Sequence, residues 1–186
     1  MHDPQVLPAD LPVPVGDGAA DHMPGMAIPR LELPTTDGRG IDLAEAAASR
    51  LVLYLYPRTG QPGEEPPPGW DRIPGARGCT PEACGFRDAY DRIRACGARL
   101  IGLSSQTVAE QLELVQRLEL RHPLASDPLF AFADAMRLPT FEVAGRRLYK
   151  RLTIVARGGR VEHVFYPVFP PDRHPAEVAA WLERHA

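Results

Sequence analysis

Two runs of apolar residues dominate the first part of the chain, at residues 51–57 (LVLYLYP) and 98–105 (ARLIGLSS). Such short runs, rich in Leu, Val, Ile and Tyr, predict strands that are buried on both faces. Residues 80–97 between them have the apolar spacing of a helix, which gives the order strand, helix, strand. This order predicts two parallel strands joined by a right-handed crossover.

The remaining pattern predicts an α/β domain that begins at Ile28. Apolar and polar residues alternate around Asp37-Gly38, as in a short hairpin. Thr107 and Glu110 form a capping-box pattern before a helix with Leu112, Val115 and Leu118 on its apolar face. The other predicted elements are a helix at 130–136, strands at 147–156 and 160–168 around Gly158-Gly159, and a helix from His174.

Two segments rich in Pro and Gly lack this periodicity. Residues 1–27 are predicted to be a mobile tail, which leaves residues 28–186 as the domain. Residues 60–78 (GQPGEEPPPGWDRIPGARG) form a long inserted loop where connections usually span about 2 to 6 residues. Long loops of this kind are more often functional than accidental.

Composition and charge narrow the function. The chain has 186 residues, of which 44% are hydrophobic, and a formal charge of -3. These values predict one globular domain and give no electrostatic reason to expect nucleic acid or an anionic membrane as partner. Without a basic segment followed by an apolar run at the N-terminus, or a run of about 18 apolar residues elsewhere, a cytoplasmic location is expected.

Cys79 is the strongest candidate nucleophile among the three cysteines. It precedes Thr80 and Pro81, a predicted N-cap and first helical residue, so its sulfur lies at the electropositive start of a helix, with Arg77 two residues before it. A thiol attacks as the thiolate, which this position favours. The alternative is a small buried apolar side chain.

Cys84 and Cys96 lie further along the same predicted helix. On an ideal helix, five residues separate the Cα atoms of Cys79 and Cys84 by about 8 to 9 Å, beyond the ~7 Å limit for a disulfide. A disulfide between them would require the first helical turn to unwind; otherwise Cys84 is a core residue. Cys96 precedes Gly97, the predicted C-cap, and is interpreted as structural. No histidine stands at metal-ligand spacing with the cysteines, so neither a metal nor another cofactor is expected.

The segment CTPEACGFRD after a YLYP strand resembles the peroxiredoxins of the bacterioferritin-comigratory, or Q, type. The entry segment at 28–43, the strand at 98–105 and the late hairpin at 150–165 extend the resemblance to about residues 27–186. The resemblance implies a thioredoxin-like α/β fold, with a central mixed sheet flanked by helices.

The resemblance also implies roles for single residues. Cys79 would be the peroxidatic cysteine and Cys84 the resolving cysteine, and Arg151 in KRLTIV matches an arginine that holds the thiolate and the peroxide. Ala76 stands where the family has a Thr or Ser, three residues before the peroxidatic cysteine. Thr59 in YPRTG is the proposed replacement, with Pro57 and Gly78 expected beside the substrate. Arg151 as a surface strand residue and Thr59 as an ordinary loop residue are the alternatives.

The resemblance thus predicts a thiol peroxidase that reduces hydrogen peroxide or organic hydroperoxides through a Cys79 sulfenic acid and a Cys79–Cys84 disulfide. Thioredoxin or a similar dithiol would recycle the protein, which is expected to be a monomer or a weak homodimer. Two rivals remain. One is a thiol-disulfide oxidoreductase on the same fold, although its usual Cys-x-x-Cys is absent, and the other is a non-enzymatic redox sensor or holdase.

Overall fold

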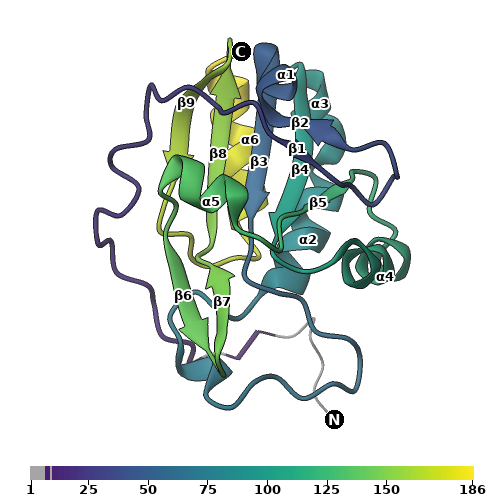
Figure 1. Ribbon diagram of the computed structural model, residues 1–186, viewed down its shortest axis with the longest axis vertical. Helices are drawn as coiled ribbons and strands as arrows, with labels where there is room; N and C mark the ends of the chain where they lie inside the picture. The colour runs from purple at the N-terminus through teal and green to yellow at the C-terminus, as the bar shows by residue number, and fades with distance from the viewer. Residues whose placement is uncertain (1–6, 9) are drawn as a thin grey trace.

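The computed structural model describes residues 7, 8 and 10–186 (Figure 1). Its centre is a five-stranded sheet in the order β5-β4-β3-β8-β9. The parallel part holds β3, β4 and β5, and β8 and β9 add antiparallel strands at the other edge. The predicted mixed sheet is therefore confirmed. The strands are β3 (Arg50–Leu55), β4 (Ala98–Ser104), β5 (Leu124–Ser126), β8 (Leu152–Arg157) and β9 (Arg160–Phe165).

Helices cover both faces of this sheet. Every residue of β3 is therefore buried, and its side chains alternate between two cores. Leu51, Leu53 and Leu55 join the core beneath α1 (Leu43–Ala48) and α5 (Ala131–Met136). Val52 and Tyr54 join the core on the opposite face. Figure 1 shows α5 in front of the sheet and α6 behind it. The helices of the second core are α2 (Cys79–Asp88), α3 (Tyr90–Ala95), α4 (Val108–Leu118) and α6 (His174–Arg184).

The helix predicted over residues 80–97 is two helices. α2 and α3 are separated at Ala89, and Cys96 is the C-cap of α3, so Cys96 does not share a helix with Cys79. The start of α2 also differs from the prediction, since Gly78 is the N-cap and Cys79 the first helical residue. The chain enters the helix through a left-handed residue, a conformation that glycine adopts without a Cβ penalty.

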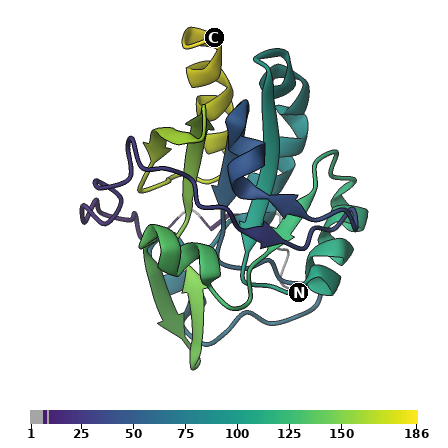
Figure 2. The same ribbon diagram turned by 45° about the horizontal axis from the view of Figure 1, so that its top comes forward.

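The strand predicted at residues 147–156 is interrupted next to Arg151. Its first part is β7 (Arg146–Tyr149), which pairs with β6 (Thr140–Val143) in a hairpin outside the central sheet. Figures 1 and 2 show this hairpin at the end of the molecule opposite the C-terminus. The second part is β8, so Lys150 and Arg151 connect two separate sheets.

The local predictions are largely confirmed elsewhere. β1 (Glu32–Leu33) and β2 (Ile41–Asp42) form the short antiparallel pair, and the capping box of Thr107 and Glu110 opens α4. Leu112 is exposed, however, and Leu114 faces the core in its place. The short helix α1, capped by the Asp42 side chain, was not predicted.

The segment before Ile28 was predicted to be a mobile tail, and its residues 1–6 and 9 lie outside the described part of the chain. In the described part, Met23 is fully buried in the core. The Met26 amide donates to the Met23 carbonyl, the Val161 amide donates to the Met26 carbonyl, and Asp17 forms an ion pair with Lys150. The packing therefore does not begin at the predicted boundary. Within residues 7, 8 and 10–186, no helix has the length and apolar content needed to cross a bilayer.

Candidate active site

Cys79 lies at the N-terminus of α2, where the backbone amides of the first turn point towards the incoming chain. Its side chain is 5% exposed. The preceding Gly78 has φ 104°, and a Cβ built on it would lie 2.3 Å from Cγ of Pro171. Gly78 is therefore required both by the backbone conformation and by the close approach of Pro171.

Arg151 brings a buried positive charge to this sulfur. Its Nη2 donates to Cys79 Sγ at 3.2 Å and to the carbonyl oxygens of Ala76 and Arg77 at 3.3 and 3.2 Å. Its Nη1 is paired with the carboxylate of Glu82. Because one planar guanidinium contacts both the loop before Cys79 and the sulfur, it fixes their relative positions. Arg151 is 3% exposed, which excludes the surface alternative.

Glu82 is a site residue that the sequence analysis missed. It lies three residues after Cys79 in α2, is fully buried and pairs with Arg151. Burial raises the pKa of this carboxyl to about 7, while the charge and the hydrogen bond of Arg151 lower it. The signal was present in the sequence, because a Glu three residues from a Cys shares its helical face.

Burial, Arg151 and Glu82 together control the ionisation of Cys79. Burial raises the pKa of the thiol above its ordinary value. The charge and hydrogen bond of Arg151 and the backbone amide of Arg58 lower this pKa, whereas Glu82 raises it. One buried cation thus faces two acidic groups, and the thiolate is favoured when Glu82 carries a proton.

Cys84 is half-buried in α2, and all three cysteines are free thiols. Since α2 runs without interruption from Cys79 to Asp88, the helical spacing of the two cysteines holds. Burial raises the pKa of Cys84, and Arg87 lowers it. In this folded form the two sulfurs are not placed for a disulfide.

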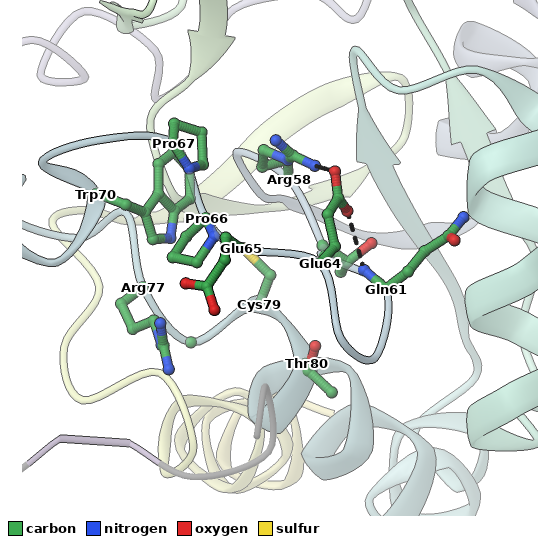
Figure 3. Close-up of a pocket in the computed structure, with 13 residues that line it drawn as sticks. Arg58, Gln61, Glu64, Glu65, Pro66, Pro67, Trp70, Arg77, Cys79 and Thr80 are labelled. Carbon is green, nitrogen blue, oxygen red and sulfur yellow. Dashed lines mark hydrogen bonds and ion pairs between the residues drawn. The ribbon is translucent and has the colours of Figure 1, made fainter. Parts of the chain in front are cut away.

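A pocket opens above Cys79, and Figure 3 shows the side chains around it. Thr59 and Gly78 lie in its wall, whereas Pro57 does not; the Pro57 carbonyl instead accepts a hydrogen bond from Ser104. The hydroxyl and the amide of Thr59 both donate to Oε1 of Gln106, at 3.2 and 2.8 Å. Among the described residues, Thr59 forms no hydrogen bond with Cys79.

The loop of residues 60–78 forms the other side of this pocket. Glu64, Glu65, Pro66, Pro67 and Trp70 all line it. Trp70 belongs to the short helix η1 (Trp70–Arg72) and is 5% exposed, because it packs on the hairpin formed by β6 and β7. The centroid of its ring lies 6.2 Å from that of Phe141. The loop is thus folded back over the start of α2.

A family model described as Redoxin matches residues 23–182. The chain belongs to the Redoxin family. It is similar to peroxiredoxin Bcp of Escherichia coli K12, with 26% identity over 171 residues that cover 87% of this chain and 96% of the relative. Peroxiredoxin Q of Oryza sativa subsp. japonica is 26% identical over 159 residues, and the match spans 86% of this chain but 66% of that relative.

Solved structures agree with this assignment. Peroxidoxin BcpB of Mycobacterium tuberculosis is similar with a TM-score of 0.71 and 26% identity, over 89% of this chain and 99% of that one. The bacterioferritin comigratory protein of Xanthomonas campestris, which has alkyl peroxide reduction activity, gives a TM-score of 0.66 at 22% identity, over 95% and 99% of the two chains. This chain is a peroxiredoxin of the bacterioferritin-comigratory type with a thioredoxin-like fold.

In this peroxiredoxin, residues distant in sequence meet at one sulfur. Cys79 and Arg151 are in direct contact, and Thr59 and Gly78 share the pocket with Cys79. Cys84 lies on the same helix, outside the pocket lining. Glu82 is the buried partner of Arg151 and Gln106 is the buried partner of Thr59, and neither was a predicted site residue.

Proposed function

We propose that this peroxiredoxin is a thiol peroxidase in which Cys79 attacks the peroxide. The observation that carries the proposal is the 3.2 Å contact between Arg151 and Cys79 Sγ at the base of a pocket. A guanidinium at this distance stabilises the thiolate and can donate to peroxide oxygens as the O–O bond breaks. A cysteine that only packs in the core does not require a buried cation beside its sulfur.

The first half of the reaction needs one proton to move. The thiol proton of Cys79 passes to Glu82, so the cluster keeps one negative charge opposite Arg151. The thiolate attacks the terminal hydroxyl oxygen of the peroxide, the O–O bond breaks, and the leaving oxygen takes up the proton that Glu82 received from the thiol. The products are a Cys79 sulfenic acid and water, or an alcohol from an organic hydroperoxide.

The second half of the reaction regenerates the thiol. Cys84 attacks the sulfenic sulfur, water leaves and a Cys79–Cys84 disulfide forms. The helical spacing of the two cysteines requires the first turns of α2 to unwind for this step. A dithiol protein of the thioredoxin type then reduces the disulfide. We expect the enzyme to act as a cytoplasmic monomer or weak homodimer.

Thr59 has a proposed role on the substrate side of the pocket. Because its hydroxyl proton points to Gln106, its oxygen is held as an acceptor for the O–H of a bound peroxide. Thr59→Val keeps the shape and removes this acceptor, so the peroxide rate should fall while alkylation of Cys79 by iodoacetamide stays the same. Unaltered peroxide kinetics would exclude this role for Thr59.

Three cysteine variants test the proposal. Cys79→Ser should abolish peroxide consumption, whereas Cys84→Ser should allow one oxidation and leave a sulfenic acid that a dimedone probe traps. Cys96→Ser is the matched control and should turn over normally with thioredoxin. Stopped-flow oxidation followed by disulfide mapping measures all three. Full turnover by Cys79→Ser would refute the assignment.

A further inference from the structure

The loop of residues 60–76 lines one side of the space above Cys79. The pocket has a free volume of about 40 Å³. A single water needs roughly 10 to 15 Å³ of such free volume, so the space suits a molecule of a few heavy atoms. Cys79 lies on one side of this space, and Pro66, Pro67 and Trp70 belong to the side that the loop contributes (Figure 3).

We call the side formed by the loop, with Pro66, Pro67 and Trp70, the wall. The wall is held in place at both of its ends, and its middle is stiff. Trp70 packs with Ala76 and Leu148 in a small core of its own. At the other end, Arg117 of α4 donates to the carbonyl oxygen of Gly60 at 3.2 Å, and Arg58 pairs with Glu64 at 3.1 Å. The three consecutive prolines at 66–68 have fixed φ angles, which limits how far the wall can yield.

We propose that this wall restricts the enzyme to hydrogen peroxide and other small hydroperoxides. The inference rests on the proposed peroxidase function and names its substrate class. Attack requires the peroxide oxygen to approach Sγ, and a bulky group on the second oxygen then has to fit into the pocket that Pro66 and Pro67 line. Hydrogen peroxide carries no such group, so it fits without displacing the loop.

A double variant of the wall tests the proposal. Pro66→Gly with Pro67→Gly removes both rings and frees the backbone, while the Trp70 anchor stays. Pro68→Gly is the matched control, because Pro68 belongs to the same proline run but does not line the pocket. Second-order rates of Cys79 oxidation with hydrogen peroxide and cumene hydroperoxide are measured by rapid quench for each protein.

The wild-type enzyme should prefer hydrogen peroxide by at least about tenfold, in the range of steric discrimination by a pocket wall. The double variant should lose most of this preference through a faster reaction with cumene hydroperoxide, and Pro68→Gly should retain it. Equal wild-type rates with the two peroxides, or an unchanged preference in the double variant, would overturn the proposal.

A second readout separates this proposal from the peroxidase assignment. In a Cys84→Ser/Cys96→Ser background, only Cys79 can be alkylated. Iodoacetamide should react at similar rates with and without the wall substitutions, whereas a fluorescein maleimide should react about tenfold faster in the double variant. If neither peroxide is consumed but the maleimide rates still differ, the wall restricts access to Cys79 and the proposed peroxidase function is wrong. Equal maleimide rates contradict the wall itself.

Discussion

Nη2 of Arg151 lies 3.2 Å from Cys79 Sγ, while Nη1 of the same guanidinium is paired with Glu82. Two acidic groups therefore share one cation in the interior. Since a second buried negative charge would be uncompensated, ionisation of the thiol and of the carboxyl must be coupled. The reactivity of Cys79 is thus a property of three residues.

Arg151→Met should lower the second-order rate with peroxide by about 10²- to 10³-fold, as removal of an oxyanion-hole donor does. The reaction of the disulfide with the reductant should change far less, because the cation acts on the oxygen charge. Glu82 would be left buried without its partner, so the variant should also lose stability.

The double variant Arg151→Met/Glu82→Gln controls for that loss. It should recover stability in urea unfolding but not the peroxide rate. A double variant that recovers the rate would show that Arg151 acts only through folding.

Glu82→Gln should shift the pH profile of Cys79 to lower pH. The Glu82 carboxylate raises the pKa of Cys79, and the amide removes that charge while keeping an oxygen that accepts from Arg151. The variant resembles the protonated carboxyl, so the thiolate should form at lower pH than in the wild-type protein. Iodoacetamide alkylation from pH 5 to 9, in the Cys84→Ser/Cys96→Ser background, measures the shift. An upward shift would contradict the coupling.

Gly78→Ala should disrupt the start of α2. Its φ of 104° lies outside the usual range of L residues, and the new Cβ would meet Pro171 at 2.3 Å. We expect a loss of about 1 to 3 kcal/mol from backbone strain, a further loss from the clash with Pro171, and loss of peroxide turnover. Gly63→Ala is the control, since φ is 80° there and no atom lies within 4 Å of the new Cβ. Similar losses in unfolding free energy and activity for both variants would argue against the role of Pro171.

Two buried histidines should make the fold acid-sensitive. Burial lowers the pKa of His122 and of His174 to about 3, from an ordinary 6.5. The unfolded chain binds these protons first, so their stabilising contribution is complete above pH 6.5 and is lost as the pH falls towards 3. Each proton changes the free energy of unfolding by about 1.4 kcal/mol per pH unit.

Glu82 acts in the opposite direction between its ordinary pKa of 4.5 and its folded value of about 7, because the folded state binds that proton more tightly. Urea unfolding at several pH values should still show a net loss of stability towards acid. His174→Gln should flatten this dependence, and substitution of the exposed His185 should not. An identical slope in both variants would contradict the assignment to His174.

The sequence alone determined the elements whose signals are local. The apolar run of β3, the capping box of α4 and the Cys79 position at a helix start follow from neighbouring residues, whose propensities and capping act within one turn or strand. The family motif around Cys79 and Cys84 is also contiguous, so it could be recognised without coordinates.

Only the tertiary structure decided which distant side chains meet. The partner of Glu82 is 69 residues away in Arg151, and the partner of Thr59 is 47 residues away in Gln106. The β6–β7 hairpin was missed because its strands leave the central sheet and pack instead against Trp70 of the loop at residues 60–78. These contacts depend on the burial of charges and apolar surface between elements, a free energy that exists only once the sheet has brought them together.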